Sequence, residues 1–304
     1  MFNVSMLAED LGGYRSAEPL SITITHTRIN NGGGALLARS MDAPRDHSII
    51  IVGAGSCGRA IATLIRDVMG ISYYYYDIDP SRSLDGGKRA GDLGGFDIYH
   101  ICVPEDRVEN LVSKIPTGSS VIIHSTMPVG GMRRLGRGDL VYMPMFFREM
   151  HIEKDIRSPG RIVTGTSSGS CPQGYVLSLT TRWAIKYGAK IYCLSYEEAE
   201  IVKLGTNALR ALAISFYNEI YYISKKYGAD HNKIFDILSP TEILDNLEGG
   251  RWGRRKELAG KPFDGKCLPK DLDHIASAST FRSSIFRAIK SLNREIREIG
   301  LDNH

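Results

Sequence analysis

The segment "FDGKCLPKD" at 263–271 places one cysteine between a glycine turn and a proline. Proline suits the first turn of a helix because its φ is fixed and it has no N–H to donate. We therefore expect Pro269 to be the first helical residue, Leu268 the cap and Cys267 the residue just outside. The helix dipole and Lys270 would both lower the pKa of such a thiol toward a nucleophilic thiolate. The alternative is a small apolar residue that fills a loop.

A second group of residues fits phosphate binding. The apolar run "SIIIV" leads into Gly53, Gly55 and Gly58, spaced as G-x-G-x-x-G, and then into a segment of helical period. In such a turn the first glycine permits the bend, the second admits a pyrophosphate, and the third lets helix and strand pack closely. Asp77 ends the next strand and would accept hydrogen bonds from the adenosine ribose, which favours NAD over NADP. Arg82 nearby keeps NADP open.

The elements around these residues alternate between strand and helix. After the glycine turn, "SYYYYDIDP", "DIYHICVP", "SSVIIHSTMP", "DLVYMP" and "RIVTG" are short apolar runs separated by turns or helix-like segments. This alternation predicts an α/β fold with a Rossmann-like, doubly wound parallel sheet wrapped by helices. We expect this NAD-binding domain to cover residues 47–195.

The flanking parts of the chain have a different character. From residue 196 apolar residues recur at helical spacing for some thirty residues, which predicts one long central helix in an all-helical domain over 196–304. Further helices are expected at "HNKIFDILSP" and "TEILDNL", a loop at 249–266, and one final helix from about 271 to 299. Residues 1–46 read as an N-terminal extension, either a hairpin of "SITITHTRI" with "ALLARSM" or a disordered segment.

Bulk properties narrow the classes of function. The chain has 304 residues, 42% of them hydrophobic and 24% charged, as in an ordinary soluble globular protein. The net charge of +4 is small and spread along the chain, so we do not expect a nucleic-acid partner. No apolar run approaches the roughly 18 residues of a membrane helix. The five cysteines are widely spaced without metal-site pairing, and the chain starts with no signal peptide, which together predict a cytoplasmic protein without a metal site.

The remaining motifs resemble those of the UDP-glucose dehydrogenase family, the nucleotide-sugar 6-dehydrogenases. "STMPVG" is similar to the family's Ser-Thr-Val-x-Pro-Gly segment, and "MPMFFREMHIEKD" to its Asn-Pro-Glu-Phe-Leu-x-Glu-Gly stretch followed by an Asp. "EAEIVKLGTNALRALAISFYNEI" resembles the central helix, and "GKCLPKD" the segment with the catalytic cysteine. The resemblance covers about residues 48 to 275.

The resemblance implies a reaction in which a primary alcohol is oxidised twice, to an acid, with NAD as cofactor. Lys203 and Asn207 stand at i and i+4, so both project from one face of the long helix and can meet one substrate oxygen. Apolar neighbours of Lys203 favour an inward position over a solvated one. Cys267 would attack the aldehyde and give a thiohemiacetal, then a thioester. Asp271 and Thr126 would order water.

The resemblance also implies two sets of binding residues. Glu149 is either a substrate ligand or a substitute base for hydrolysis, and the alternative for it is a surface salt bridge with Arg148 or Lys154. Cofactor contacts are expected from Gly53, Gly55, Ser56, Cys57, Gly58, Asp77, Val103, Pro104, Ser125, Thr126 and Lys270. Substrate contacts are expected from Phe147, Arg148, Glu149, Lys203, Asn207 and Arg251.

Two departures from the family bear on activity. Met145 stands where the family has the Glu of Pro-Glu-Phe, a residue linked to thioester hydrolysis. Only a short stretch follows the cysteine motif, so we expect the family's third, UDP-binding domain to be absent. The alternatives are therefore a two-electron hydroxyacid-type dehydrogenase that uses Lys203, and a non-catalytic NAD-binding paralogue. A sugar or nucleotide sugar is the expected substrate, and a homodimer through the long helix is the expected assembly.

Overall fold

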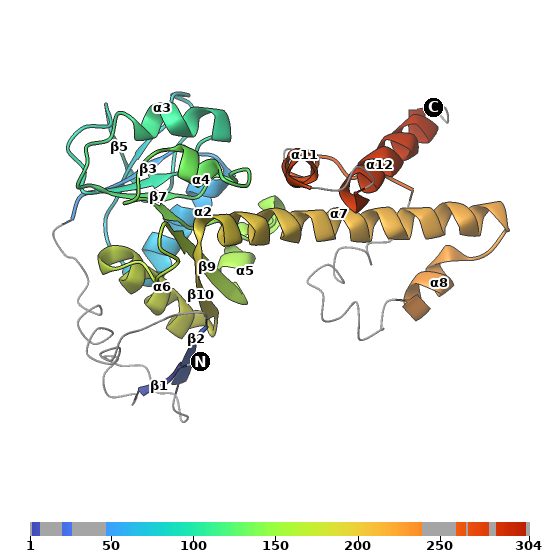
Figure 1. Cartoon of the computed structure of the whole chain (residues 1–304), viewed down its shortest axis with the longest axis horizontal. Coiled ribbons are helices and arrows are strands. Elements are labelled where there is room, and N and C mark those ends of the chain that lie inside the picture. Colours follow the sequence, from blue (N-terminus) through green and yellow to red (C-terminus); the bar gives the residue numbers. More distant parts are fainter. Residues whose placement is uncertain are drawn as a thin grey trace. The chain divides into compact units, whose positions relative to one another are not determined.

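The computed structural model describes residues 2–6, 20–25, 47–238, 260–265, 267–279 and 284–301. The chain divides into two compact units, Met1–Glu200 and Ile201–His304. The first unit contains the strands, and the second contains helices among its described residues (Figure 1). The first unit carries the predicted glycine turn, and the second carries the predicted cysteine segment.

The first unit is built on a 10-stranded sheet with the order β1-β2-β10-β9-β8-β7-β6-β3-β4-β5. Neighbouring strands are parallel except for the β1–β2 and β8–β9 pairs. The strands are β1 Phe2–Met6, β2 Leu20–Thr25, β3 Ile49–Val52, β4 Tyr74–Tyr76, β5 Lys88–Arg89, β6 Ile98–Ile101, β7 Ser120–Ile123, β8 Val141–Tyr142, β9 Arg161–Thr166 and β10 Lys190–Ser195. The parallel-dominated α/β fold expected from the sequence is confirmed.

The order of the central strands fixes where a ligand can bind. The chain runs from β3 to β4 on one side and then returns to β6 on the other, so the strand order reverses beside β3. Every residue of β3 and β6 is buried, as expected for parallel strands covered on both faces. Ligands of open α/β sheets bind outside the carboxyl ends of strands at such a reversal. The glycine turn directly follows β3, and therefore lies at this point.

Helices pack against the sheet of the first unit. An apolar core joins residues of β3, β4 and β10 to residues of α2, α5 and α6. Helix α2 continues into a π-helical segment, Ile65–Met69, that packs on α6. The helices of this unit are α2 Ser56–Leu64, α3 Val108–Val112, α4 Gly131–Arg134, α5 Ile152–Ile156 and α6 Gly174–Tyr187, with short 3-10 turns at Glu105–Arg107 and Glu149–His151.

The N-terminal extension contributes two strands to the same sheet. β2 begins one residue before the predicted strand "SITITHTRI" and overlaps its first five residues, and it pairs antiparallel with β1 and parallel with β10. The strand partner differs from the expected one, because β1 precedes β2 in the chain whereas the predicted hairpin used the later segment "ALLARSM". That later segment lies outside the described residues.

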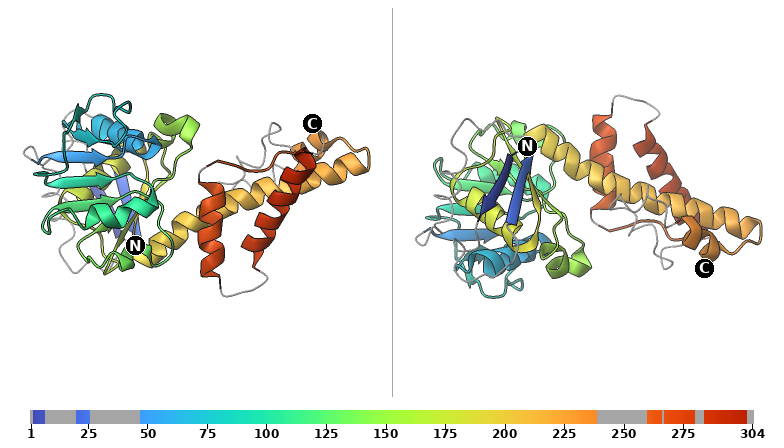
Figure 2. Two further views of the ribbon diagram at one scale, coloured as in Figure 1. Left: turned by 90° about the horizontal axis from the view of Figure 1, so that it is seen from above. Right: turned by 90° about the horizontal axis from the view of Figure 1, so that it is seen from below.

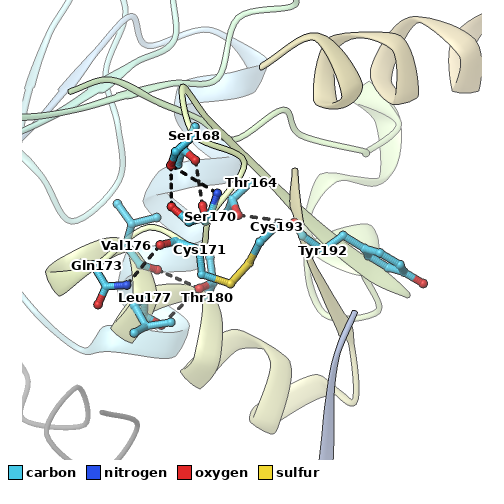
Figure 3. The surroundings of a disulfide bond; sticks show 11 residues. Thr164, Ser168, Ser170, Cys171, Gln173, Val176, Leu177, Thr180, Tyr192 and Cys193 are labelled. Carbon is cyan, nitrogen blue, oxygen red and sulfur yellow. Dashed lines mark hydrogen bonds between the residues drawn. A yellow bond between two sulfur atoms is a disulfide. The ribbon is translucent and has the colours of Figure 1, made fainter. Parts of the chain in front are cut away.

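One pair of cysteines forms a disulfide that the sequence did not predict. Cys171, in the turn before α6, is bonded to Cys193 of β10, with their Cα atoms 4.9 Å apart (Figure 3). The two cysteines are 22 residues apart in the sequence, and the fold of β9, α6 and β10 brings them together. The sequence alone therefore did not indicate that they form a pair. Cys57, Cys102 and Cys267 are free thiols.

The second unit is helical where the structure describes it. Helix α7, Tyr196–Lys226, begins in the first unit and has 31 residues, in agreement with the long helix of some thirty residues expected from residue 196. The others are α8 His231–Leu238, α11 Leu268–Ala278 and α12 Ile285–Leu301. Both views of Figure 2 place α11 and α12 beside each other and against α7. No helix within the described residues is long and apolar enough to cross a membrane.

One expected helix of the second unit is divided in the structure, and two other expected segments lie wholly or mostly outside the described residues. The predicted final helix of 271–299 is wrong, because Ser279 is extended at φ −71° and ψ 132° and ends α11, and Ser284 starts α12 by accepting the Arg287 N–H. Serine hydroxyls compete with a helix for backbone hydrogen bonds, and serines stand at both the end of α11 and the start of α12. The predicted helix "TEILDNL" and most of the predicted loop lie outside the described residues.

Candidate active site

The glycine turn after β3 has the shape of a phosphate-binding loop. Gly53 has φ +102°, and a Cβ there would meet the Cys102 carbonyl oxygen at 2.6 Å. A Cβ on Gly58 would meet the Gly53 oxygen at 1.9 Å, so this glycine lets α2 approach the strand. At Gly55, by contrast, the nearest atom to a Cβ is Arg82 Nη1 at 3.8 Å. The open space at Gly55 is what a pyrophosphate over the helix N-terminus requires.

The carboxylate of Asp77 accepts hydrogen bonds from the backbone of this turn and of the residues after β4. It is 8% exposed, and its two carboxylate oxygens accept the N–H groups of Ala54 at 2.7 Å and Asp79 at 2.9 Å. The first of these bonds anchors the glycine turn to the end of β4. Asp77 therefore has a structural function that sequence reasoning missed, in addition to the ribose contact expected for it.

The ends of β6 and β7 bring further predicted cofactor residues together. Ser125 is 8% exposed, and its hydroxyl donates to the Val103 carbonyl at 2.6 Å. Pro104 caps the 3-10 turn that follows β6, and Thr126 is half-buried beside Ser125. Because β6 and β7 are parallel neighbours, these residues share the edge of the sheet at which the glycine turn lies.

Glu149 occupies a position that neither sequence interpretation foresaw. Its carboxylate accepts the hydroxyl of Ser56, the first residue of α2, so a negative side chain lies at the N-terminus of that helix. A carboxylate is favourable there because it meets the positive end of the helix dipole. The guanidinium of Arg148, one of the two salt-bridge partners expected for Glu149, donates twice to Asp155.

Three other residues near Glu149 in the sequence are buried or half-buried in the first unit. The guanidinium of Arg148 and its backbone N–H all bond to Asp155, and the ion pair holds the pKa of Arg148 above its usual value. Phe147 is partly buried against the apolar core. Met145 belongs to that core and is 4% exposed. None of these three side chains is therefore presented openly to a substrate.

In the second unit, α7 buries an unusually polar face. Lys203 is 7% exposed and Asn207 is 3% exposed, one turn apart. Arg210, 9% exposed, donates through Nη1 to Asn207 Oδ1 at 3.2 Å. The apolar neighbours that suggested an inward lysine do not all surround it, since Ile201 is 50% exposed. Polar residues on the buried face of a helix normally have partners or a function, because an unpaired polar group is costly inside a protein.

The partner of Asn207 is Asp271 of α11. Asn207 Nδ2 donates to Asp271 Oδ2, and Asp271 is completely buried. Its other oxygen, Oδ1, accepts no hydrogen bond from the described residues and lies 4.0 Å from Lys270 Nζ. Such an acceptor is a position for a water molecule or a substrate hydroxyl.

Cys267 lies one helical turn before this carboxylate. The backbone N–H of Asp271 donates to the Cys267 carbonyl at 2.8 Å. Helix α11 begins at Leu268, one residue earlier than expected, so Cys267 is its cap residue and Pro269 occupies the second position. Proline fits that position as well as the first, because the N–H groups of the first turn have no partner within the helix. The Cys267 side chain is exposed, as a nucleophile must be.

Two asparagines that sequence reasoning did not select hold the chain before Cys267. Asn218 of α7 donates to the Lys261 carbonyl at 2.6 Å and accepts the Gly260 N–H at 2.9 Å. Asn293 of α12 accepts the Phe263 N–H at 2.8 Å and donates to its carbonyl at 3.0 Å. Asparagine is a poor residue for a helix interior, and this was the available signal.

Two expectations remain outside the described geometry. Arg251, expected to bind substrate, lies among residues that the structure does not describe. In the described part of the chain no group of three or more His, Cys, Asp or Glu side chains could hold a metal ion. The first unit therefore carries the glycine turn with Asp77, and the second unit carries Lys203, Asn207, Asp271 and Cys267.

The sheet order and glycine turn define a Rossmann-type α/β protein that carries a helical unit. Residues 197–295 match the sequence pattern of the UDP-glucose/GDP-mannose dehydrogenase family, central domain. The UDP-glucose 6-dehydrogenase of Campylobacter jejuni is 29% identical over 198 residues, which are 63% of this chain and 46% of that protein. The UDP-glucose 6-dehydrogenase TuaD of Bacillus subtilis is 29% identical over 188 residues, 61% of this chain and 38% of that protein. These matches support the resemblance to the UDP-glucose dehydrogenase family that the sequence motifs indicated.

Solved structures with the same fold include more than one kind of dehydrogenase. A UDP-glucose dehydrogenase from Pyrobaculum islandicum superposes with a TM-score of 0.65 at 22% identity, over 84% of this chain and 69% of that one. A 3-hydroxyisobutyrate dehydrogenase from Mycobacterium tuberculosis gives a TM-score of 0.59 at 15% identity, over 84% of this chain and 94% of that one. At these identities the likeness is one of fold. The chain spans less than half the length of the Campylobacter jejuni and Bacillus subtilis relatives.

Proposed function

We propose that the chain is an NAD-dependent dehydrogenase that oxidises the primary alcohol of a sugar or nucleotide sugar, with Cys267 as the nucleophile. The observation that supports this most is the buried Asp271 carboxylate. One of its oxygens is held by Asn207, the other accepts no hydrogen bond from the described residues, and Cys267 lies one helical turn away. A hydroxyl-bearing substrate or an ordered water would satisfy that oxygen.

The first unit fits a dinucleotide. The open space at Gly55 and the half-buried helix start at Ser56 suit a pyrophosphate, and the edge with Val103, Pro104, Ser125 and Thr126 suits the nicotinamide half. Bound NAD would accept the hydride removed from the substrate. Asp77 favours NAD over NADP because its carboxylate would repel a 2′-phosphate. Glu149 would have to release Ser56, or share it, when a pyrophosphate approaches the start of α2.

The second unit supplies groups that can hold an alcohol and its aldehyde. Lys203 would place a positive charge, and Asn207 a directed N–H, against the oxygen on which negative charge develops. Asp271 would take the alcohol proton through an ordered water. Because Asn207 is already oriented by Arg210 and Asp271, its amide is fixed before substrate binds.

Cys267 would act on the aldehyde. Its sulfur forms a bond to the carbonyl carbon, the thiol proton passes to the carbonyl oxygen, and a thiohemiacetal results. Transfer of a second hydride from that carbon to a second NAD, with loss of the hydroxyl proton, would leave a thioester. Water then releases the acid and restores the thiol. Asp271, whose Oδ1 accepts no hydrogen bond from the described residues, is the candidate for ordering that water. Lys270 would hold the charge of Asp271 or of the substrate.

The proposal is tested by NADH formation with the full chain against UDP-, GDP- and free sugars. We expect NADH with at least one sugar and a covalent adduct on Cys267 visible by intact mass. Cys267→Ser should give no adduct and should stop at the aldehyde or before it. Asp271→Asn keeps the size of the side chain and the contact with Asn207 but removes the charge, and should slow NADH formation about 10² to 10⁴ fold.

Two other outcomes would support different functions. One NADH per substrate, with no adduct and with dependence on Lys203 alone, would indicate a hydroxyacid-type dehydrogenase, the class of the Mycobacterium tuberculosis protein of similar fold. NAD binding without NADH formation from any sugar would indicate a non-catalytic paralogue. We further propose that the protein acts as a homodimer in the cytoplasm.

A further inference from the structure

Glu200 is a buried carboxylate that is not among the predicted site residues. It lies in the second turn of α7, and it is the last residue of the first unit. The residue is 0% exposed. Its Oε2 accepts the Gly130 N–H at 2.6 Å, and its Oε1 accepts the Met132 N–H at 2.7 Å. Each oxygen of this carboxylate therefore holds one backbone N–H of a segment that is distant in the sequence.

The two N–H groups belong to the start of α4. Gly130 is the N-cap residue of this helix, and Met132 is its second residue. The Gly131 N–H, which lies between them in the sequence, donates to the Pro128 carbonyl at 2.8 Å. The first N–H groups of a helix have no partner within the helix, and a glycine at the N-cap has no side chain to accept them. Glu200 supplies these acceptors from α7.

The segment that Glu200 holds is a tight turn. Gly130 has φ +78°, in the left-handed region that favours glycine. A Cβ on Gly131 would meet Pro128 Cδ at 2.9 Å, so the chain folds back closely on the proline. A turn packed in this way has little freedom, and a displacement at Gly130 would be passed along the backbone to the residues before it.

The residues before this turn are those expected at the nicotinamide half of the cofactor. Ser125 and Thr126 lie just after β7, and the Ser125 hydroxyl donates to the Val103 carbonyl at 2.6 Å. Thr126 therefore lies between one contact at Ser125 and the two contacts that Glu200 makes at the end of the turn.

We propose that the ionised carboxylate of Glu200 is a positioning group for NAD, which fixes the turn after β7 and thereby holds Ser125 and Thr126 against the nicotinamide half. The inference rests on the proposed cofactor role of this edge, and all of these residues lie in the first unit. Glu200 acts through the backbone of the turn and not by contact with the cofactor. Its charge is required because a protonated carboxyl group carries a hydrogen on one oxygen, and that oxygen would then face an N–H. One of the two bonds would be lost.

The groups around Glu200 determine how readily it takes up a proton. Burial raises the pKa of Glu200 above its usual value, and the two backbone N–H groups offset part of this increase. The negative charge of Glu197 on α7 also raises the pKa, whereas the positive charge of Arg134 on α4 lowers it. Arg133 of α4 is paired with Glu197. NAD affinity should therefore be complete above the raised pKa and should fall as the pH drops through it, at a higher pH than an ordinary glutamate would give.

The test compares Glu200→Gln with the unmodified full chain. Glutamine keeps the size and one acceptor oxygen, but its NH2 group faces the second N–H, so it imitates the protonated acid at every pH. The affinities for NAD and for ADP are measured by calorimetry from about pH 5 to about pH 8. At the upper end we expect NAD affinity to be about tenfold weaker in the variant and ADP affinity to change less than about twofold, because ADP reaches the glycine turn but not the nicotinamide edge. The difference in NAD affinity should shrink as the pH falls, because the unmodified side chain is then protonated too.

A matched variant and an exchange measurement separate positioning from general stability. Glu197→Gln breaks the ion pair with Arg133 of the same helix but leaves both bonds of Glu200, and should change NAD affinity less than about twofold. Deuterium exchange followed by NMR should show less protection of the Gly130 amide in Glu200→Gln than in Glu197→Gln. In the unmodified chain, the protection of this amide and the ratio of NAD to ADP affinity should fall over the same pH interval, and this measurement needs no variant.

Three results would overturn the inference. Equal NAD affinity of Glu200→Gln and the unmodified chain at every pH, or a ratio of NAD to ADP affinity that stays constant while Gly130 loses protection, would refute the positioning role. Weakening of NAD and ADP by the same factor at every pH would show that Glu200 only stabilises the fold. An unmodified chain that binds no NAD would refute the cofactor role and this inference together, and the Gly130 amide would still show separately whether Glu200 holds the turn.

Discussion

The buried position of Met145 changes the effect expected from its substitution by glutamate. By sequence it stands in place of a family glutamate, so Met145→Glu would be the change that restores hydrolysis. The side chain, however, is 4% exposed in the apolar core of the first unit. We expect Met145→Glu to lower the free energy of unfolding by roughly 3 to 5 kcal/mol, because an unpaired carboxylate would be buried. Met145→Leu, of similar volume, should cost less than about 1.5 kcal/mol in a urea titration.

Slow hydrolysis itself stays a prediction, and the same pair of variants tests it. The unmodified protein should give a burst of NADH followed by slow turnover, with the adduct on Cys267. A stable, folded Met145→Glu protein whose slow phase accelerates would show that residue 145 reaches the thioester despite its buried position.

A second prediction concerns the effect of Asp77 on cofactor binding. Its carboxylate holds the Ala54 N–H as well as facing the expected ribose site, so Asp77→Ala has two effects. Loss of the ribose contact should weaken NAD but not NADP, while loss of the anchor should weaken both. Calorimetric titration with each cofactor separates them, and Gly55→Val, which fills the open space of the turn, should abolish both. If Asp77→Ala weakened the binding of NAD and NADP equally, the only function of Asp77 would be to hold the glycine turn through the Ala54 N–H.

The loop before Cys267 depends on two helices that are distant in the sequence. Asn293 of α12 satisfies both backbone polar groups of Phe263, which is 5% exposed. Asn293→Ala would leave a buried N–H and C=O without partners, at about 1 to 3 kcal/mol each. We expect a lower urea midpoint and a changed alkylation rate of Cys267. Asn110→Ala, at an exposed position of α3, is the matched control and should change neither measurement.

The first unit contains a buried chain of neutral histidines between neighbouring strands. His124 Nδ1 must donate to the Met143 carbonyl at 2.8 Å, so its Nε2 accepts from His100 Nδ1, and His100 Nε2 accepts from the Tyr175 hydroxyl. Burial lowers the pKa of His124 from 6.5 to about 4 and that of His100 well below its usual value. In this arrangement each imidazole ring carries one N–H proton, and protonation of either ring would break one of these hydrogen bonds.

This chain predicts how stability depends on pH. The pKa values of both histidines are lower in the folded state than in the unfolded state, so their contribution is complete above pH 6.5 and is lost as the pH falls toward 4. The shift of His124 alone corresponds to roughly 3 kcal/mol at the acid end. Urea unfolding between pH 7 and pH 4 should show this loss, and His124→Gln should flatten the dependence. An unchanged slope in the variant would mean that carboxylates account for acid unfolding.

The sequence predicted elements better than it predicted contacts. The strand, glycine turn and α2 follow from local pattern, and α7 follows from helical period over its whole length. The Cys171–Cys193 bond and the Ser56–Glu149 contact join segments whose proximity depends on topology. The break between α11 and α12 was missed because the apolar period continues through it. Lys203 was placed correctly on the buried face, but by apolar neighbours of which Ile201 proved exposed.

At the scale of the whole molecule, an uncovered apolar stripe lies on α7. Phe216 and Ile223 of α7 and Tyr227, which directly follows the helix, are 42%, 48% and 74% exposed, and with the half-buried Ile220 they recur every three or four residues. The rest of the run "AISFYNEIYYIS" is less open than the sequence suggested, since Ile214 and Tyr217 are buried within the second unit. The stripe is therefore narrow, and it belongs to one face of a single helix.

We expect this stripe to pair with its copy in a second chain. A two-fold axis would place the same residues of both α7 helices against each other, as isologous interfaces require, and would remove their apolar surface from water. Sedimentation velocity at micromolar concentration should give a dimer, and Phe216→Asp with Ile223→Asp should give a folded monomer. Ile237→Asp is the matched control, because Ile237 of α8 is 74% exposed and lies off the stripe. A monomeric wild-type chain, or a control that dissociates the dimer equally, would show that α7 is not the interface.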